Sequence, residues 1–187
     1  MERTKTKIFI RKILKQIFPD KKTEMELKAL AKKMLIVTKR KAKKYGATAI
    51  IVGSITRDTW LPEKKEFDIF ILFPKELSIA ELEKYGLEIG KEVVNEMKGS
   101  FTLKYAQHPY ISARIKDVDV DIVPCYKIKD ASELKSAVDR TPFHVKYLEK
   151  NLKKNQAKEV RLLKKFLKSH DLYGADAKIQ GFSGYLC

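Results

Sequence analysis

Two short apolar segments, joined by a turn that begins with Gly53-Ser54, most constrain how this chain can fold. The segment at 49–52 is rich in β-branched residues and ends at a glycine, which predicts a buried strand. The segment at 66–73 predicts a second strand, and Glu66 and Asp68 share one face of it. Two carboxylates on one face of an apolar strand repel each other, and a hard divalent cation relieves that repulsion. The alternative is a solvated strand edge, where two such acids need no cation.

A third acidic position lies farther along the chain. Beyond a helix that a capping box at Ser78 predicts, apolar and polar residues alternate in an antiparallel meander at the sheet's edge. Its last strand, at 118–123, carries Asp119 and Asp121 on the face opposite its apolar residues. Three carboxylates on neighbouring strands can hold two Mg²⁺ ions and support in-line nucleotidyl transfer. Spacing alone does not decide whether Asp119 or Asp121 is the third ligand.

Helical periodicity surrounds these strands. Two basic amphipathic helices are predicted before the first strand, one ending near Phe18-Pro19 and the other spanning about 23–45. After the meander, helix starts are predicted at Asp130 and at Thr141-Pro142. A final helix is predicted at about 155–169. We expect it to bury Val160, Leu163, Phe166 and Leu167 and to expose Lys158, Arg161, Lys164, Lys165 and Lys168.

The basic charge of the chain is concentrated at its N-terminal end. The formal net charge is +16, and residues 1–45 hold 16 Lys and Arg against 4 Asp and Glu. This excess predicts a polyanionic partner such as RNA. The alternative is that these lysines are only the solvated faces of the two helices.

Other compositional features narrow the class of protein. With 187 residues, 44% of them hydrophobic, the chain can bury the core of one domain and part of another. No apolar run approaches the roughly 20 residues of a membrane span, and the N-terminus lacks a secretory-signal pattern. We therefore expect a cytoplasmic protein without a membrane partner. Cys125 and Cys187 have no Cys or His companions and are expected to be structural thiols.

Five motifs follow one another from about residue 49 to the last residue. They are Gly53-Ser54-x-x-Arg57-Asp58-Thr59-Trp60-Leu61, Glu66-Phe67-Asp68, Asp119-Val120-Asp121-Ile122-Val123-Pro124-Cys125-Tyr126, Ser136-Ala137-Val138-Asp139-Arg140-Thr141-Pro142-Phe143-His144 and Gly181-Phe182-Ser183-Gly184-Tyr185-Leu186. Together they resemble the archaeal-type, class I, CCA-adding tRNA nucleotidyltransferases. The first 45 residues are similar to that family only in style, as basic helices before the first motif strand.

The resemblance implies a fold and a division into domains. The implied fold is α+β, of the nucleotidyltransferase (polymerase-β-like) type: a small mixed sheet with helices on one face, followed by a helical segment. Residues 1–140 would form a catalytic head domain with basic N-terminal helices, and residues 141–187 would begin a helical central domain. Family members are more than twice as long, with further domains that bind the acceptor arm of tRNA. Together with the apolar end at 181–187, this leads us to expect a truncated chain.

The resemblance also implies the site. The implied catalytic residues, which are also the ligands of two Mg²⁺ ions, are Glu66, Asp68 and Asp121. The implied nucleotide-binding residues are Gly53, Ser54, Arg57, His144, Lys164 and Tyr173. Without the resemblance, His144 would be read as a capped or solvated helix histidine and Lys164 as a solvated-face lysine. His108 and His170 have no implied role.

The implied activity is template-independent addition of CCA to the tRNA 3′ end from CTP and ATP. The implied partners are tRNA and these two nucleotides, and the oligomeric state is left open, a homodimer of the full-length protein included. Two alternatives are kept: another enzyme of the same fold, such as a poly(A) polymerase or an oligoadenylate synthase, and a non-catalytic basic RNA-binding module. We expect this short chain to bind nucleotide and metal weakly and to transfer nucleotides to tRNA poorly.

Overall fold

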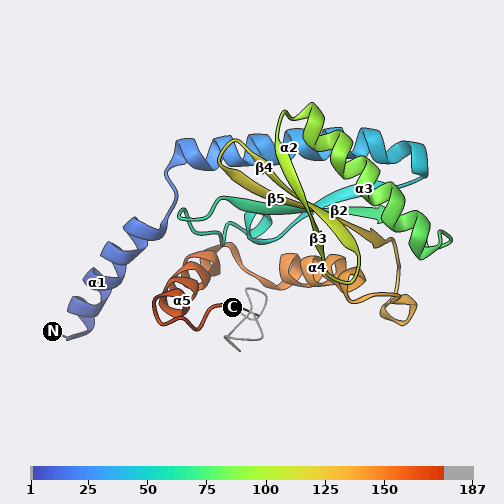
Figure 1. Ribbon diagram of the computed structural model, residues 1–187. Coiled ribbons are helices and arrows are strands. Elements are labelled where there is room, and N and C mark those ends of the chain that lie inside the picture. Colours follow the sequence, from blue (N-terminus) through green and yellow to red (C-terminus); the bar gives the residue numbers. More distant parts are fainter. Residues whose placement is uncertain (1, 175–187) are drawn as a thin grey trace.

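The computed structural model describes residues 2–174 and shows one five-stranded sheet between two groups of helices (Figure 1). The helices are α1 (Glu2–Ile17), α2 (Lys21–Ala42), α3 (Ile79–Glu96), α4 (Thr141–Asn151) and α5 (Ala157–Ser169). The strands are β1 (Thr48–Val52), β2 (Glu66–Phe73), β3 (Ser100–Tyr105), β4 (Pro109–Ile115) and β5 (Val118–Tyr126). Short 3₁₀ turns are η1 (Lys43–Tyr45), η2 (Ser54–Arg57), η3 (Ala131–Glu133), η4 (Ala137–Arg140) and η5 (Lys154–Gln156). The expectations for Cys187 and for the end at 181–187 lie outside the described residues.

The sheet is mixed and has the strand order β1-β2-β5-β4-β3. Only the β2–β5 pair is parallel, and the other three pairs are antiparallel. The predicted meander is present as β3, β4 and β5, with β3 at the edge and β5 in the interior of the sheet. The predicted neighbourhood of the Glu66 and Asp121 strands is therefore confirmed.

Helices α2 and α3 cover one face of the sheet, where they build the main core (Figure 1). Leu27 and Met34 of α2 and Ile89 of α3 are completely or almost completely buried there. Helix α3 approaches β4 very closely, because a Cβ on Gly90 would stand 2.6 Å from Cγ1 of Ile111. Glycine is therefore required for this contact between helix and sheet.

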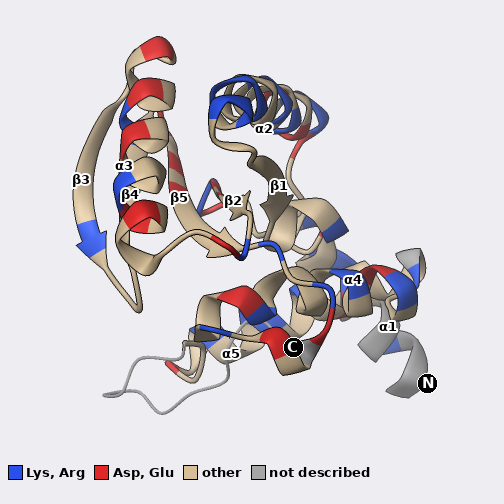
Figure 2. Ribbon diagram, turned by 90° about the vertical axis from the view of Figure 1, so that its right-hand side faces the viewer, with Lys and Arg blue, Asp and Glu red and all other residues tan. Residues whose placement is uncertain are grey.

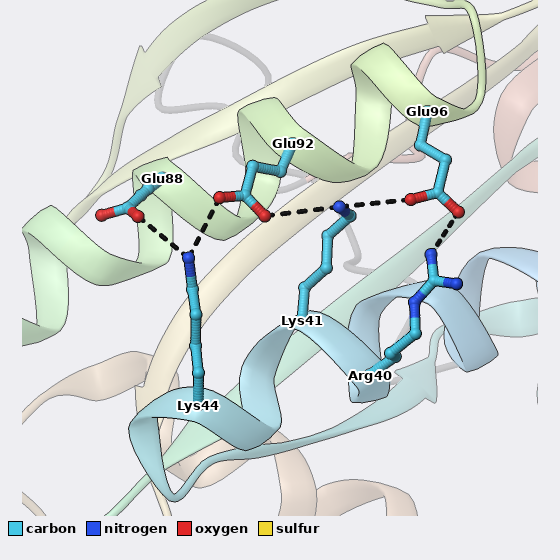
Figure 3. Close-up of polar contacts among 6 residues, drawn as sticks. All are labelled: Arg40, Lys41, Lys44, Glu88, Glu92 and Glu96. Atoms are coloured by element: carbon cyan, nitrogen blue, oxygen red, sulfur yellow. Dashed lines mark hydrogen bonds and ion pairs between the residues drawn. The ribbon is translucent and has the colours of Figure 1, made fainter.

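Ion pairs join α2 and its 3₁₀ extension η1 to α3 on the outside of this layer (Figure 3). Lys44 lies 3.0 Å from both Glu88 and Glu92, and Lys41 lies 3.3 Å from Glu92. The same series continues toward Glu96, which pairs with Lys41 at 3.2 Å and also with Arg40. Three basic residues of the N-terminal region therefore hold helices together, while other lysines along α2 stay exposed (Figure 2).

Helices α4 and α5 lie on the opposite side of the sheet (Figure 1). Val145 of α4 packs with Val52, Phe70 and Cys125 in a second, smaller core. Cys125 is buried, and this burial raises the pKa of its thiol, so the predicted structural role of this cysteine fits its position. The helical segment predicted after the sheet thus packs against the carboxylate-bearing face.

The prediction of which face α5 buries was wrong in part: Leu167 is buried and Lys158 and Lys165 are exposed as expected, but four other residues differ. Arg161 and Lys164 are buried, whereas Leu163 and Phe166 have exposed fractions of 43% and 55%. The buried heads donate hydrogen bonds to backbone carbonyls of the 59–60 segment, and such long side chains can pack their apolar stems as they do so. The charges of Arg161 and Lys164 therefore indicated a solvated face, whereas these two side chains attach α5 to the 59–60 segment.

The helix predicted to start at Asp130 is only the single 3₁₀ turn η3. Asp130 accepts a hydrogen bond from Ser132 N, and Glu133 accepts one from Lys129 N while pairing with Lys75 at 2.6 Å. These contacts stabilise a local turn that competes with helix formation. Within residues 2–174, no helix has the length and apolar content that crossing a membrane requires.

Candidate active site

The three predicted carboxylates lie on the two parallel strands at the centre of the sheet. In the register of β2 and β5, Asp68 stands opposite Asp121, and Glu66 stands opposite Asp119. Glu66, Asp68 and Asp121 all line one cavity of about 490 Å³. Asp119 is paired with Arg114 at 2.6 Å. The register thus favours Asp121 over Asp119 as the partner of Asp68, a choice that sequence spacing could not make.

Electrostatic repulsion is built into this carboxylate group. Burial, then the negative charges of Asp121 and Glu66, raise the pKa of Asp68 to about 7, against a small opposing effect of Lys64. A carboxyl group with such a pKa is only about half ionised near pH 7 unless a cation offsets the neighbouring charges. The site therefore favours a bound positive charge.

The chemistry of the carboxylate group suits a divalent metal. All three side chains offer oxygen ligands, which Mg²⁺ prefers, and the raised pKa of Asp68 shows the charge density that such an ion would offset. Across residues 2–174 no three His, Cys, Asp or Glu side chains are already arranged as a metal-binding group. Glu66 is instead paired with Lys64 at 2.5 Å. The residues fit Mg²⁺ once Glu66 exchanges Lys64 for the ion.

The turn after β1 places backbone and side chains beside these acids. Gly53 has φ +91°, and a Cβ there would stand 2.9 Å from Oδ2 of Asp68, so only glycine fits without strain. Ser54 and Arg57 begin and end the 3₁₀ turn η2 and both line the cavity. Burial lowers the pKa of Arg57, while the charge of Glu149 opposes that shift. No carboxylate in the described part of the chain forms an ion pair with Arg57, which fits a site for an anion.

The helical segment supplies the far wall of the cavity. His144 of α4, Lys164 of α5 and Tyr173 all line it. Burial and the charge of Arg140 lower the pKa of His144, which therefore remains neutral near pH 7. Lys164 is 5% exposed, and its Nζ lies 3.2 Å from the carbonyl oxygen of Thr59. All nine predicted site residues are thus brought to the same cavity, although their roles remain predictions.

Two further residues escaped the sequence analysis. Tyr110 of β4 lines the same cavity, and burial together with the charges of Asp121 and Asp68 raises its pKa. Asp139 is completely buried, and its carboxylate accepts hydrogen bonds from the backbone N–H groups of Tyr126 and Ser136. It ties the end of β5 to η4, directly before α4. The signals for Asp139 were its place in the fourth motif and its position three residues after Ser136, with which it forms a capping box, whereas Tyr110 had none.

Two family models match the chain. The model for the nucleotidyltransferase domain matches residues 31–144, and the model for the second domain of tRNA nucleotidyltransferases matches residues 158–187. Among curated relatives, the CCA-adding enzyme of Archaeoglobus fulgidus is 44% identical over 183 residues, which are 98% of this chain and 40% of that protein. The CCA-adding enzyme of Methanocaldococcus jannaschii is 51% identical over 138 residues, 74% of this chain and 31% of that protein. The predicted resemblance is confirmed, and the chain spans about two-fifths or less of these relatives.

Solved structures agree with the fold. Cid1, described as having RNA terminal uridylyl transferase activity, matches with a TM-score of 0.69 at 15% identity, over 97% of this chain and 50% of that one. The polymerase core of the RNA surveillance complex TRAMP matches with a TM-score of 0.60 at 15% identity, over 94% and 50%. At such identity these structures show the fold alone, and they confirm the predicted polymerase-β-like type. With a domain model that matches most of its length, the chain belongs to the nucleotidyltransferase domain family.

Proposed function

We propose that this chain is the catalytic part of an enzyme that adds CCA to the 3′ end of tRNA from CTP and ATP without a template. The observation that carries the proposal is the gathering of nine residues, from positions far apart in the sequence, around one cavity. The similarity to curated CCA-adding enzymes supports the choice of tRNA as the acceptor. A tRNA substrate is also consistent with the expected cytoplasmic location.

In this proposal, Glu66, Asp68 and Asp121 hold two Mg²⁺ ions. When bound, such ions lower the pKa of an attacking hydroxyl and neutralise charge on the triphosphate. The carboxylates themselves define where the reacting phosphate sits, because Asp68 and Asp121 stand side by side on adjacent strands. The bond between the RNA 3′ oxygen and the α-phosphorus forms as the bond to pyrophosphate breaks, and the hydroxyl proton passes to solvent.

Residues on the β1 side of the carboxylates bind the triphosphate. Arg57 gives charge-assisted hydrogen bonds to phosphate oxygens, and Ser54 donates its hydroxyl hydrogen. Gly53 lets the backbone come close to the phosphates. Productive transfer also needs the α-phosphate held within near-attack distance of the RNA hydroxyl, since an error of about 1 Å can cost on the order of 100-fold in rate.

The helical wall completes the nucleotide site. Lys164 adds a second cation from α5, and neutral His144 offers a ring nitrogen from α4 as a hydrogen-bond partner. Tyr173 adds a phenol at the same wall. Each of these residues reaches the cavity from an element that follows the sheet, so nucleotide binding depends on both parts of the chain.

We also propose the domain division expected from the sequence. Residues 1–140 form the head domain and residues 141–187 begin a helical second domain. The match of the first family model ends at residue 144 and that of the second begins at residue 158, which supports a division in this region.

The decisive experiment supplies tRNA that lacks its terminal CCA together with one labelled nucleotide at a time. The protein at the full length of its relatives should incorporate C first and A only after C. Incorporation of A without prior C would favour a poly(A) polymerase or oligoadenylate synthase. RNA binding without any incorporation, unchanged by Asp68→Ala with Asp121→Ala, would favour a basic RNA-binding module.

A companion measurement uses the 187-residue chain itself. We expect it to bind nucleotide with Mg²⁺ or Mn²⁺ but to extend tRNA poorly, because it spans about two-fifths of its relatives. Titration with Mn²⁺ should show binding that the double alanine variant loses. Extension at the rate of the longer protein would show that the chain already positions tRNA.

A further inference from the structure

A second cavity, of about 310 Å³, lies on the other side of α4 from the catalytic cavity. Phe143 and Lys146 of α4, one turn apart, line this second cavity. His144 and Leu148 of the same helix line the catalytic cavity instead. Among residues 2–174, none lines both cavities. Helix α4 therefore presents a different side to each of them.

Strand β2 runs beneath both cavities. Every second side chain of a strand shares a face, so Asp68, Phe70 and Leu72 follow one another on the face that α4 covers. Phe70 and Leu72 pack with Val145 of α4 in the smaller core, and Leu72 also lines the second cavity. At about 3.3 Å per residue, Leu72 stands about 13 Å along the strand from Asp68. The second cavity is therefore separate from the catalytic carboxylates.

The second cavity combines an apolar floor with a cationic rim. Ile50 and Leu72 pack in the smaller core and form the floor, beside the half-buried ring of Phe143. The rim carries three exposed lysines, namely Lys127, Lys129 and Lys146. No carboxylate among residues 2–174 lines this cavity. Such a site fits a ligand that has a flat apolar part and several negative charges.

Nearby lysines differ from these three because carboxylates already compensate them. Lys75 pairs with Glu133 at 2.6 Å. In the hollow between α2 and the β4–β5 turn, Lys65 pairs with Asp117 at 2.5 Å, and Glu26 lines the same hollow. Within the described part of the chain, the three rim lysines form no ion pair of this kind. Their charges are therefore available to a bound anion.

The chemistry of the second cavity fits a nucleoside phosphate. A lysine ammonium group binds phosphate as a point charge, and an aromatic ring stacks on a base. Nζ of Lys146 lies 6.0 Å from the centre of the Phe143 ring, so the ring and the cation can contact neighbouring parts of one ligand. A volume of about 310 Å³ is near the lower end for ligand sites, which limits the ligand to one nucleotide.

We propose that the second cavity binds a nucleoside polyphosphate, with its base on Phe143 and its phosphates at the three rim lysines. Binding here needs no divalent metal, because cations of the protein itself compensate the phosphates. The catalytic cavity differs, because its three carboxylates repel phosphate until a metal ion is bound. The inference goes beyond the proposed function, since none of the predicted site residues lines the second cavity.

The test titrates ATP in EDTA into the 187-residue chain that carries Arg57→Ala. EDTA removes the metal and Arg57→Ala removes a phosphate-binding cation from the catalytic cavity, while the carboxylates remain there to repel phosphate. We expect one equivalent of ATP to bind. Inorganic triphosphate and adenosine, which each supply one half of the ligand, should bind at least about tenfold more weakly.

Variants of the second cavity, made in the same background, locate this binding. Lys127→Glu with Lys146→Glu should weaken ATP binding at least about tenfold, because two attractive charges become repulsive. Phe143→Leu removes the ring but keeps an apolar side chain, and it should weaken binding about tenfold. Phe143→Tyr keeps the ring and should stay within about threefold. Thermal unfolding establishes that each variant is folded.

The matched control is Lys91→Glu with Lys158→Glu, which makes the same charge change at exposed positions of α3 and α5 outside both cavities. It should leave ATP binding within about twofold. Absence of ATP binding, equal losses in the control, or triphosphate binding as tight as that of ATP would overturn the inference. Displacement of ATP by lower concentrations of an RNA pentanucleotide would overturn the assignment to a free nucleotide. No transfer to tRNA enters this test, so its result is independent of the proposed function.

Discussion

Asp68 on β2 and Asp121 on β5 stand opposite each other in a parallel register, inside a partly buried cavity. The pKa of Asp68 is raised from 3.8 to about 7 in the folded protein. A raised pKa means that the folded state favours the protonated acid, so ionisation costs stability. In the absence of metal, this carboxyl therefore reduces the free energy of unfolding progressively as pH rises from about 4 to about 7, by at most about 4 kcal/mol.

We expect Asp68→Asn to raise the melting temperature of the metal-free protein at pH 8 and to change it little at pH 4. Thermal unfolding with EDTA at both pH values measures the difference. Addition of Mg²⁺ should stabilise the unchanged protein more than the variant at pH 8. Glu76→Gln, which changes an exposed acid, serves as the control and should show neither effect.

The close approach of Gly53 to Asp68 can be tested by comparison with Gly46, a second glycine at positive φ that lies away from the acids. Gly53→Ala should cost about 1–3 kcal/mol in stability and should also weaken nucleotide binding, because the new Cβ meets Asp68 at 2.9 Å. Gly46→Ala also places a side chain at positive φ, but the nearest atom to its Cβ is Cγ of Pro74 at 3.5 Å. Urea unfolding and nucleotide titration separate the two variants. An equal loss of nucleotide affinity in both would contradict the close approach at Gly53.

The anchor of α5 can be tested at Arg161. Its Nε donates a hydrogen bond to the carbonyl oxygen of Trp60 at 3.0 Å, and the guanidinium stacks 4.4 Å from the centre of the Phe18 ring. Arg161→Met keeps much of the apolar stem but leaves a buried carbonyl without its donor, which should cost about 1–3 kcal/mol. Lys158→Met on the exposed side of α5 should be near neutral. Denaturant unfolding measures the free energy of unfolding of both variants. Equal values for Arg161→Met and Lys158→Met would contradict the anchoring role of Arg161.

The ion pairs between α2 and α3 should stabilise the fold in a salt-dependent way. Glu92 contacts both Lys41 and Lys44, so Glu92→Gln weakens two pairs at once (Figure 3). Because the side chains are partly exposed, we expect the melting temperature to fall by less than about 5 °C at low salt. The difference should vanish near 1 M salt, where charges are screened. Lys91 forms no ion pair within residues 2–174, so Lys91→Gln should show no such salt dependence.

Sequence patterns predicted the elements whose burial follows a simple period. The two motif strands and the helix capped by Ser78 are present, and the hydrogen bonds of the predicted capping box are formed between Ser78 and Glu81. These signals depend on contacts between residues only a few positions apart, so the structures that they predict do not depend on how distant segments pack. The same signals could not choose between Asp119 and Asp121, because the pairing of β2 with β5 is set by packing between distant segments.

The buried faces of the helical segment were harder to predict for the same reason. Nothing near Arg161 or Lys164 in the sequence indicates that their side chains donate hydrogen bonds to the carbonyls of the 59–60 segment. Asp139 is similar in one respect: Ser136 N lies only three residues away, but Tyr126 N comes within reach of the carboxylate only when β5 and η4 meet. In both cases a charged residue is buried by a partner from elsewhere, and hydrophobic periodicity reads it as exposed.

The strand order also governs when the site can exist during protein synthesis. Strand β5 inserts between β2 and β4, although α3, β3 and β4 all leave the ribosome before it. Until Tyr126 has emerged, one edge of β2 remains without its parallel neighbour, and Asp68 has no opposing acid. Lys164 and Tyr173 arrive later still. A nascent chain therefore cannot assemble the cavity that gathers the nine predicted site residues until nearly all of residues 2–174 have been made.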